Sequence, residues 1–239
     1  CAFASVILNK KCNYHIHAKY NFYESILISF ISKFKYTNKI IFCSKYNFDN
    51  FRKNLIPLNH KKISIIENGL SEDFDNEKYI NRFVFNKEKV LLKLAIVGSL
   101  KPEKGQDIVI PLAKKFPEID FYLVGKESSD NYEWIDSIKS QKSSNIFFQG
   151  ELINIKEFID KNNINIFLVP SKWNEPFGLV AIEGMSLSCI TIVSNKGGLT
   201  DIAKNTGALI YSKEIELIEI MKYLESIGQN KLAEISNNQ

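Results

Sequence analysis

Ser171-Lys-Trp-Asn-Glu-Pro-Phe-Gly-Leu-Val-Ala-Ile-Glu183 joins a predicted strand to a predicted helix. Before it, the apolar run at residues 165–169 is typical of a buried strand, which Pro170 ends. After it, Pro176 suits the first turn of a helix over residues 176–187. The segment therefore predicts a strand–loop–helix unit of the kind from which parallel sheets are built.

Two carboxylates and a helix N-terminus lie within this unit. Phe177, Gly178 and Leu179 would present unpaired backbone N–H groups at the start of the helix, and such groups favour an anion. Glu175 lies just before the helix and Glu183 about two turns inside it, about 12 Å away if the whole stretch is helical. This layout suits a nucleotide sugar, which has ribose hydroxyls, a diphosphate and hexose hydroxyls.

The same residues carry a family resemblance. The string Glu175-Pro-Phe-Gly-x4-Glu183, followed by Gly197-Gly198, resembles the Glu-x7-Glu region of retaining, family 4-type glycosyltransferases with the GT-B fold. The alternative is an ordinary βα unit with two surface glutamates, because pairs at this spacing also occur by chance. The resemblance implies an α/β protein of two Rossmann-like domains with the active site in the cleft between them. It also implies sugar transfer from a nucleoside-diphosphate-sugar donor with retention of anomeric configuration.

Length and composition are those of an ordinary soluble protein. The 239 residues can form one large or two small domains, and 45% hydrophobic with 24% charged residues argues against disorder. The net charge of +4 suits a phosphate-bearing ligand or an anionic membrane surface, and is equally typical of a solvated surface. No basic and aromatic pattern indicates a nucleic-acid partner, and no apolar run approaches the ~18 residues that span a bilayer. Since the four cysteines lack metal or disulfide spacing, we expect a cytoplasmic protein, with the inner membrane surface as an option.

Short apolar runs alternate with amphipathic stretches along the chain, which indicates parallel sheets with crossover helices. The expected strands are residues 14–17, 39–43, 63–66, 92–97, 120–124, 145–148, 165–169, 189–193 and 208–210. The expected helices are residues 21–35, 106–116, 132–140, 155–161, 176–187 and 213–227. Four side chains form one stripe on the first of these helices: Phe22, Ile26, Phe30 and Phe34.

A polar stretch after the turn dipeptide Asn68-Gly69 indicates a domain boundary. We predict part of an N-terminal, acceptor-side Rossmann-like domain at residues 1–71, a linker at 72–90 and a donor-nucleotide-binding Rossmann-like domain at 91–239. The resemblance is most specific from Leu94 to Asp201. It implies that the front of the first domain and the last helix of the family are absent, so we expect a chain truncated at both ends.

A second candidate site follows the predicted strand at residues 92–97. Gly98 lets a ligand approach the backbone closely, and a helix is expected to begin near Gly105. In the family an Arg and a Lys of this stretch bind the donor diphosphate, which assigns that role to Lys104. Ser99 stands where Arg is usual, and Lys101 cannot reproduce the planar, bidentate Arg fork. Weak donor binding, altered donor choice, lost activity and a plain turn with exposed lysines all fit this departure.

The remaining candidates rest on the resemblance alone. His17 ends the first predicted strand, where the family commonly has a functional histidine near the donor sugar. A structural histidine fits as well, and we expect His15 to point to the opposite face. Gly150 and Leu152 lie in a loop that often holds the base through backbone groups.

No metal and no other cofactor are expected, because no cluster of ligand side chains shows the spacing of a metal site. A transferase without a metal must neutralise the departing diphosphate with cations and helix N-termini. Lys104 and the amides of residues 177–179 could do so. The loop Gly197-Gly198 would support the donor, with Thr200 or Asp201 capping a helix that follows.

We therefore predict a retaining glycosyltransferase of the hexosyltransferase type. Glu183 would hold the ribose hydroxyls, Glu175 the hexose hydroxyls and Lys104 the diphosphate. His17 would shape the sugar site. The acceptor stays open among a glycan, a lipid-linked molecule and a small molecule, as does peripheral membrane contact. One alternative is a noncatalytic nucleotide-sugar-binding fragment or degenerate transferase; another is a GT-B epimerase or phosphorylase, for which we find no candidate acid/base residue or cofactor lysine.

Overall fold

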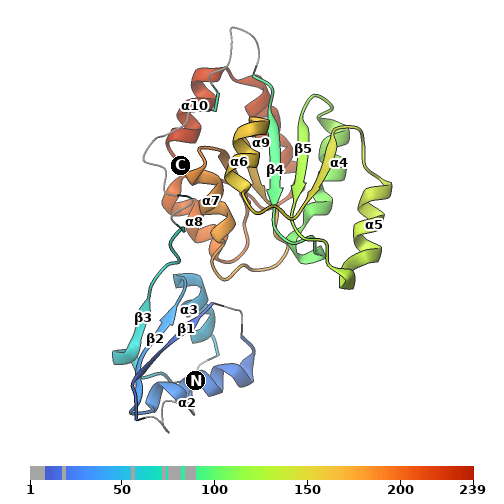
Figure 1. Cartoon of the computed structure of the whole chain (residues 1–239). Helices are drawn as coiled ribbons and strands as arrows, with labels where there is room; N and C mark the ends of the chain where they lie inside the picture. The colour runs from blue at the N-terminus through green and yellow to red at the C-terminus, as the bar shows by residue number, and fades with distance from the viewer. Residues whose placement is uncertain (1–8, 18–19, 55–56, 72–73, 75–81, 84–89) are drawn as a thin grey trace. The chain divides into compact units, whose positions relative to one another are not determined.

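The computed structural model describes residues 9–17, 20–54, 57–71, 74, 82–83 and 90–239 (Figure 1). By its internal contacts the chain divides into two units. The first holds residues 1–69 together with Glu175–Phe177, and the second holds residues 70–174 and 178–239. Each is built from parallel strands joined by helices, which confirms the predicted α/β class. Most of the predicted linker at 72–90 lies outside the described residues, so the predicted domain limits stay predictions.

The first unit is a three-stranded parallel sheet in the order β1-β2-β3. Its elements are β1 (Cys12–Ile16), α2 (Phe22–Lys33), β2 (Thr37–Phe42), α3 (Lys45–Arg52), the 3-10 helix η1 (His60–Lys62) and β3 (Ile63–Ile65). Ile28 of α2 and Phe51 of α3 pack with Ile40 and Phe42 of β2 in one apolar cluster. Both helices therefore cover the same face of the sheet.

The second unit is a six-stranded parallel sheet in the order β6-β5-β4-β7-β8-β9. Its strands are β4 (Lys93–Val97), β5 (Asp120–Val124), β6 (Ile146–Gly150), β7 (Ile166–Val169), β8 (Ile190–Ser194) and β9 (Leu209–Tyr211). Its α-helices are α4 (Val109–Lys115), α5 (Tyr132–Ser140), α6 (Ile155–Asn162), α7 (Leu179–Ser186), α8 (Gly198–Thr206), α9 (Glu214–Ser226) and α10 (Gln229–Asn237). Among the described residues, 3-10 helices accompany them at η3 (Pro102–Lys104), η4 (Gln106–Ile108) and η5 (Ser129–Asn131).

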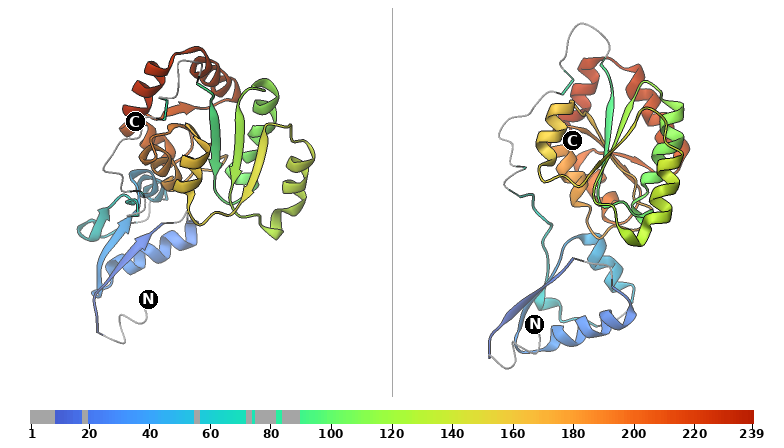
Figure 2. Two further views of the ribbon diagram at one scale, coloured as in Figure 1. Left: turned by 45° about the horizontal axis from the view of Figure 1, so that its top comes forward. Right: turned by 45° about the vertical axis from the view of Figure 1, so that its right-hand side comes forward.

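Helices cover both faces of this sheet (Figure 2). Leu94 and Ile96 of β4 pack into one apolar cluster with α4 and α9, while Ala95 between them packs into another with α7 and α8. Because both faces are buried, the strands are apolar without alternation, which is why they were recognisable as continuous runs. Within the described residues, every helix is too short or too polar to cross a membrane.

Several predicted element limits are wrong. The helix expected at 176–187 begins at Leu179, and the one expected at 106–116 is split into η4 and α4. Pro111 lies in the first turn of α4, where its missing N–H costs no hydrogen bond. Helices α3 and α10 were not expected, because both are short and largely polar.

Candidate functional site

The strand order of the second unit reverses between β4 and β7. The chain runs from β4 outward to β5 and β6, and then returns to the other side of β4 for β7, β8 and β9. In open parallel sheets of this kind, ligands bind outside the carboxyl ends of the strands at the point of reversal. Both stretches selected from the sequence, residues 98–105 and 171–183, follow β4 and β7 directly. The topology therefore brings the two candidate motifs to the same edge of one sheet.

The loops that follow β4 and β7 touch each other. The Lys172 N–H donates to the carbonyl oxygen of Glu103 (2.9 Å), and the Lys172 Nζ lies 2.5 Å from Oδ2 of Asp107. Gly105 has a left-handed backbone (φ 74°), and a Cβ atom built there would collide with the carbonyl oxygen of Pro170. Glycine is thus required after Lys104 both by backbone conformation and by the close approach of the second loop.

Lys104 contacts an aromatic ring that sequence reasoning missed. Its Nζ lies 5.5 Å from the ring centroid of Trp173, within the range of a cation–π contact. Both side chains are half-buried, and the contact joins the two loops at the sheet edge. The signal available in the sequence was an aromatic residue two positions before Glu175, inside the motif itself.

The turn after β4 is held by a buried glutamine, which was also missed. The Gln106 Nε2 donates to the carbonyl oxygens of Ser99 (2.9 Å) and Gly98 (3.3 Å), and its Oε1 accepts from the Lys101 N–H (3.4 Å). Gln106 is 1% exposed, whereas Ser99 is exposed at the strand end. The loop is thus fixed from inside, and residue 99 faces solvent where the family resemblance places an arginine.

Lysine is the source of positive charge at this edge. Residues 91–239 contain no arginine. Lysines occur instead in the loops after five of the strands: Lys101 and Lys104 after β4, Lys126 after β5, Lys172 after β7, Lys196 after β8 and Lys213 after β9. An anion bound here would meet ammonium groups, which act as flexible point charges and not as bidentate forks.

Helix α7 begins three residues later than predicted, which changes the amides available to an anion. Gly178 is the N-cap residue in a left-handed conformation (φ 107°), so Phe177 is not part of the helix. The Ala181 N–H already donates to the Gly178 carbonyl oxygen (2.9 Å), which leaves the amides of Leu179 and Val180 at the open end of the helix. A Cβ at Gly178 would collide with Leu199 of α8, so glycine is also needed for helix packing.

The two glutamates have different settings. Glu183 lies on α7 and is half-buried, and this burial raises the pKa of its carboxyl group. Glu175 lies in the loop before Gly178 and is grouped by its contacts with the first unit. The expected separation of about 12 Å between Glu175 and Glu183 assumed a continuous helix. It does not apply, because the residues before Leu179 are not helical.

His17 directly follows β1 in the first unit and is exposed. Its ring stacks on that of His15, with centroids 5.6 Å apart and planes at 19°. The prediction that His15 points to the opposite face is wrong, because residues two apart in a strand share a face. A role of His17 at the donor sugar stays a prediction.

The other predicted positions belong to the second unit, where they lie at the carboxyl edge of its sheet. Gly150 ends β6, and Leu152 packs partly buried against the apolar cluster under α6, α7 and α8. Gly197 is the N-cap of α8, with φ 61° and no side-chain cap. Thr200 and Asp201 therefore lie inside the helix, and the prediction that one of them caps it is wrong.

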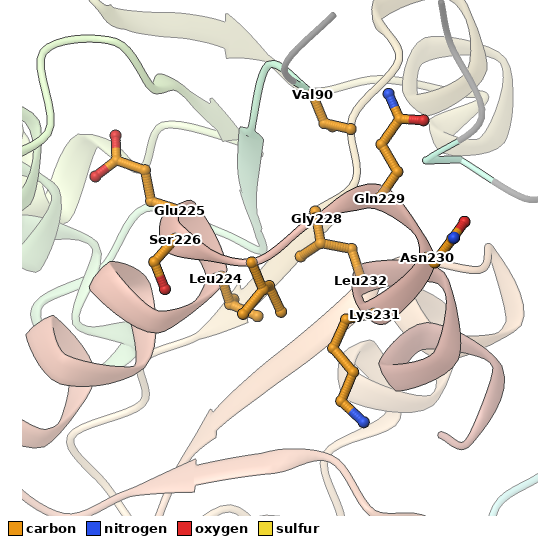
Figure 3. Close-up of a pocket in the computed structure, with 10 residues that line it drawn as sticks. Val90, Leu224, Glu225, Ser226, Gly228, Gln229, Asn230, Lys231 and Leu232 are labelled. Carbon is orange, nitrogen blue, oxygen red and sulfur yellow. The ribbon is translucent and has the colours of Figure 1, made fainter. Parts of the chain in front are cut away.

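No group of three or more His, Cys, Asp or Glu side chains that could hold a metal occurs among the described residues. The expectation that the sequence lacks metal-site spacing overlooks one Asp-x-Asp, Asp73-Phe-Asp75, whose two aspartates lie outside the described residues. A cavity of about 750 Å³ opens between the ends of α9 and α10 beside Val90 (Figure 3). None of the predicted site residues lines it. The candidate site is thus identified by topology and contacts, not by the size of a cavity.

Comparisons with known proteins agree with this architecture. The family model described as "Glycosyl transferases group 1" matches residues 76–239. An uncharacterized glycosyltransferase of Methanocaldococcus jannaschii is 29% identical over 225 residues, covering 87% of this chain and 58% of the relative. A glycogen synthase of Clostridium botulinum is 27% identical over 194 residues, covering 72% and 40%. The chain therefore spans about half the length of these relatives.

Solved structures share the fold. Anabaena HepE in complex with UDP and glucose superposes with a TM-score of 0.81 at 18% identity, covering 99% of this chain and 67% of that one. The structural neighbours are GT-B glycosyltransferases, so the predicted GT-B fold is confirmed, with this chain covering part of it. Since the family model matches well over half of its residues, the chain belongs to the group 1 family of glycosyltransferases.

Proposed function

We propose that this chain supplies the donor side of a retaining, family 4-type glycosyltransferase, which moves a sugar from a nucleoside-diphosphate sugar to an acceptor. The observation that carries this proposal is the meeting of two loops at the strand reversal of the second sheet. One loop carries Lys104, and the other leads into α7 with Glu183. The contacts of Lys172 with Glu103 and Asp107 tie them together.

The diphosphate is assigned to the space between these loops. There the ammonium group of Lys104 and the open amides of Leu179 and Val180 at the start of α7 supply positive charge. These groups would stabilise the diphosphate as its bond to the anomeric carbon breaks and negative charge grows on the leaving oxygen. The acceptor hydroxyl oxygen then bonds to the anomeric carbon on the same face of the sugar and gives its proton to the departing diphosphate oxygen, which is the retaining outcome. No metal is part of this proposal.

The carboxylates are assigned to hydroxyl groups. Glu183 accepts hydrogen bonds from the ribose, and its half-buried position on α7 strengthens such bonds by excluding water. Glu175, four residues before the helix starts, takes the hexose hydroxyls. We assign His17 of the first unit to the sugar. We assign the loop at Gly150–Leu152 to the base.

Calorimetric titration of UDP, followed by ADP and GDP, tests donor binding. UDP comes first because HepE was solved with it. Glu183→Ala should weaken binding of the nucleotide that the chain takes by about 1–3 kcal/mol, because hydrogen bonds are lost. Glu219→Ala on the exposed side of α9 should leave the affinity for that nucleotide unchanged. If all three nucleotides fail to bind, or Glu183→Ala binds as tightly as the unmodified chain, the assignment is rejected. The anomeric coupling in the proton spectrum of released or transferred sugar tests retention.

A second candidate function is a noncatalytic nucleotide-sugar-binding protein. Ser99 at the exposed end of β4 favours it, since the arginine that the family resemblance expects there is missing and residues 91–239 supply no other. Nucleotide binding without turnover of any donor sugar would support this alternative. Ser99→Arg should then raise the affinity for the donor. In a transferase that binds the diphosphate through lysine, the same substitution should leave donor affinity unchanged.

A further inference from the structure

Strand β1 directs two histidine rings to one face of the first sheet. Tyr14 and Ile16 of this strand pack, partly buried, against the apolar cluster under α2 and α3. Because side chains alternate along a strand, His15 and the directly following His17 point to the other face, which these two helices do not cover. Both histidines are exposed on that face.

The spacing of the two rings is close to that of a pair that shares a metal ion. Their centroids lie 5.6 Å apart, and their planes differ by 19°. Bonds from Zn²⁺ to imidazole nitrogen are about 2.0–2.1 Å long, so two rings on one tetrahedral ion have centroids roughly 5 Å apart. The backbone beneath them is fixed by the register of β1 with β2, in which His15 lies beside Ile41. Small rotations of the two side chains are therefore enough to bring both rings onto one ion.

The charge of this part of the chain restricts the kind of ion. Residues 1–69 contain 11 Lys and Arg against 3 Asp and Glu, a net charge of +8. Mg²⁺ and Ca²⁺ bind through carboxylate and carbonyl oxygens, and this positive charge repels them. Imidazole nitrogen instead suits Zn²⁺, Ni²⁺ and Cu²⁺. The pair therefore favours an ion that bonds to nitrogen over one that is held by charge alone.

We propose that His15 and His17 together bind one divalent transition-metal ion of the class of Zn²⁺, Ni²⁺ and Cu²⁺. The second ring binds intramolecularly once the first has bound, which makes the pair far tighter than a single histidine. Among the described residues no third His, Cys, Asp or Glu side chain completes a metal-binding group, so water takes the remaining positions. The ion has no part in the transfer proposed above. Competition between the ion and the donor sugar for His17 is a consequence that rests on the proposed function, whereas metal binding itself does not.

Calorimetric titration of the full, untagged chain with nickel chloride, in the absence of nucleotide, tests the proposal. We expect one Ni²⁺ per chain, tighter binding of Cu²⁺ than of Ni²⁺, and no binding of Mg²⁺. His15→Ala and His17→Ala should each weaken Ni²⁺ binding about 100-fold, because the remaining ring binds alone. The matched control is His60→Ala, which removes the third histidine of the chain, also exposed, and should leave the affinity unchanged.

Proton resonance spectra give a second readout, because paramagnetic Ni²⁺ should broaden the ring signals of His15 and His17 and spare those of His60. Failure of Ni²⁺, Zn²⁺ and Cu²⁺ to bind would overturn the proposal, as would a His15→Ala chain that binds Ni²⁺ as tightly as His60→Ala. Loss of binding in Cys12→Ser would overturn it as well, since the ion would then be held by a thiol. Both rings are exposed, so the histidine variants should keep the urea midpoint of the unmodified chain. Failure of nucleotides to bind would count only against the proposed donor site.

Discussion

The contact between Lys104 and Trp173 should be measurable as a coupling energy in nucleotide binding. The Lys104 Nζ lies 5.5 Å from the ring centroid, and both side chains are half-buried. A cation–π contact that keeps access to solvent contributes about 0.5–1 kcal/mol. Trp173→Ala should therefore weaken UDP binding about two- to fivefold, because the ammonium group is no longer held over the sheet edge. Lys104→Met should cost about 1.5–3 kcal/mol, since it removes a charged donor to the phosphate.

A double-mutant cycle measured by calorimetry separates a contact from a general disturbance. The four proteins are the unmodified chain, the two single variants and the double variant, each titrated with UDP. Trp173→Phe keeps an aromatic face and should recover most of the affinity lost in Trp173→Ala. Trp134→Phe on α5 is the control for losing an indole, because this ring packs against the apolar cluster on the α4 face of the sheet.

The cycle has a clear refuting result. If Trp173→Ala weakens binding by the same factor in the Lys104→Met background as in the unmodified chain, the ring does not act through the ammonium group. A different result, no binding of UDP, ADP or GDP to the unmodified chain, would count against the proposed donor site and not against the contact. Fluorescence gives an independent readout, because Trp173 is the single tryptophan left in Trp134→Phe.

The further predictions concern three residues: Glu183, Gly184 and Cys189. Burial raises the pKa of Glu183. As the solution is acidified, UDP affinity should therefore begin to fall at a higher pH than it would with an ordinary glutamate. Glu183→Gln should remove this pH dependence of UDP affinity in calorimetric titrations. Because the folded state holds that proton more tightly, stability falls as the pH rises from the unfolded to the folded pKa, and Glu183→Gln should raise the urea midpoint at neutral pH. Gly184→Ala should cost about 1–3 kcal/mol in urea unfolding, since a Cβ would lie 2.6 Å from the ring of Phe167, whereas Gly228→Ala meets no atom within 4 Å and should be nearly neutral. Burial raises the pKa of Cys189 to about 12, so iodoacetamide should label it only when the protein is unfolded; labelling of the native chain at neutral pH would contradict this.

The sequence was sufficient for most of the second sheet because its strands are buried on both faces. The strand at residues 120–124 and the helix at residues 132–140 have the limits that the pattern predicts. Both motifs were also placed correctly at strand ends. In a parallel sheet all strands end at one edge, so knowing which strand precedes a motif is enough to place it there.

Features that depend on contacts distant in sequence were not predictable. The start of α7 was misplaced because Pro176 is a favourable first-turn residue, whereas the left-handed Gly178 that sets the start responds to α8 packed beside it. Gln106 reads as an ordinary polar residue in a loop. Its function of holding the turn at Ser99 appears only when the backbone carbonyl oxygens around it are in place.

Helix α2 shows a more general limit of periodicity. The spacing of Phe22, Ile26 and Phe30 predicts correctly that they share a side of a helix, and all three are exposed. It carries no information on which way that side turns, because a stripe facing a core and a stripe facing a partner have the same period. The direction follows instead from Ser25 and Ser32, whose hydroxyls accept hydrogen bonds from the loop that packs under the helix. Polar residues on the side opposite an apolar stripe are usually taken as the solvated face. Here they form the buried face, because each of these two serines has a hydrogen-bond partner there.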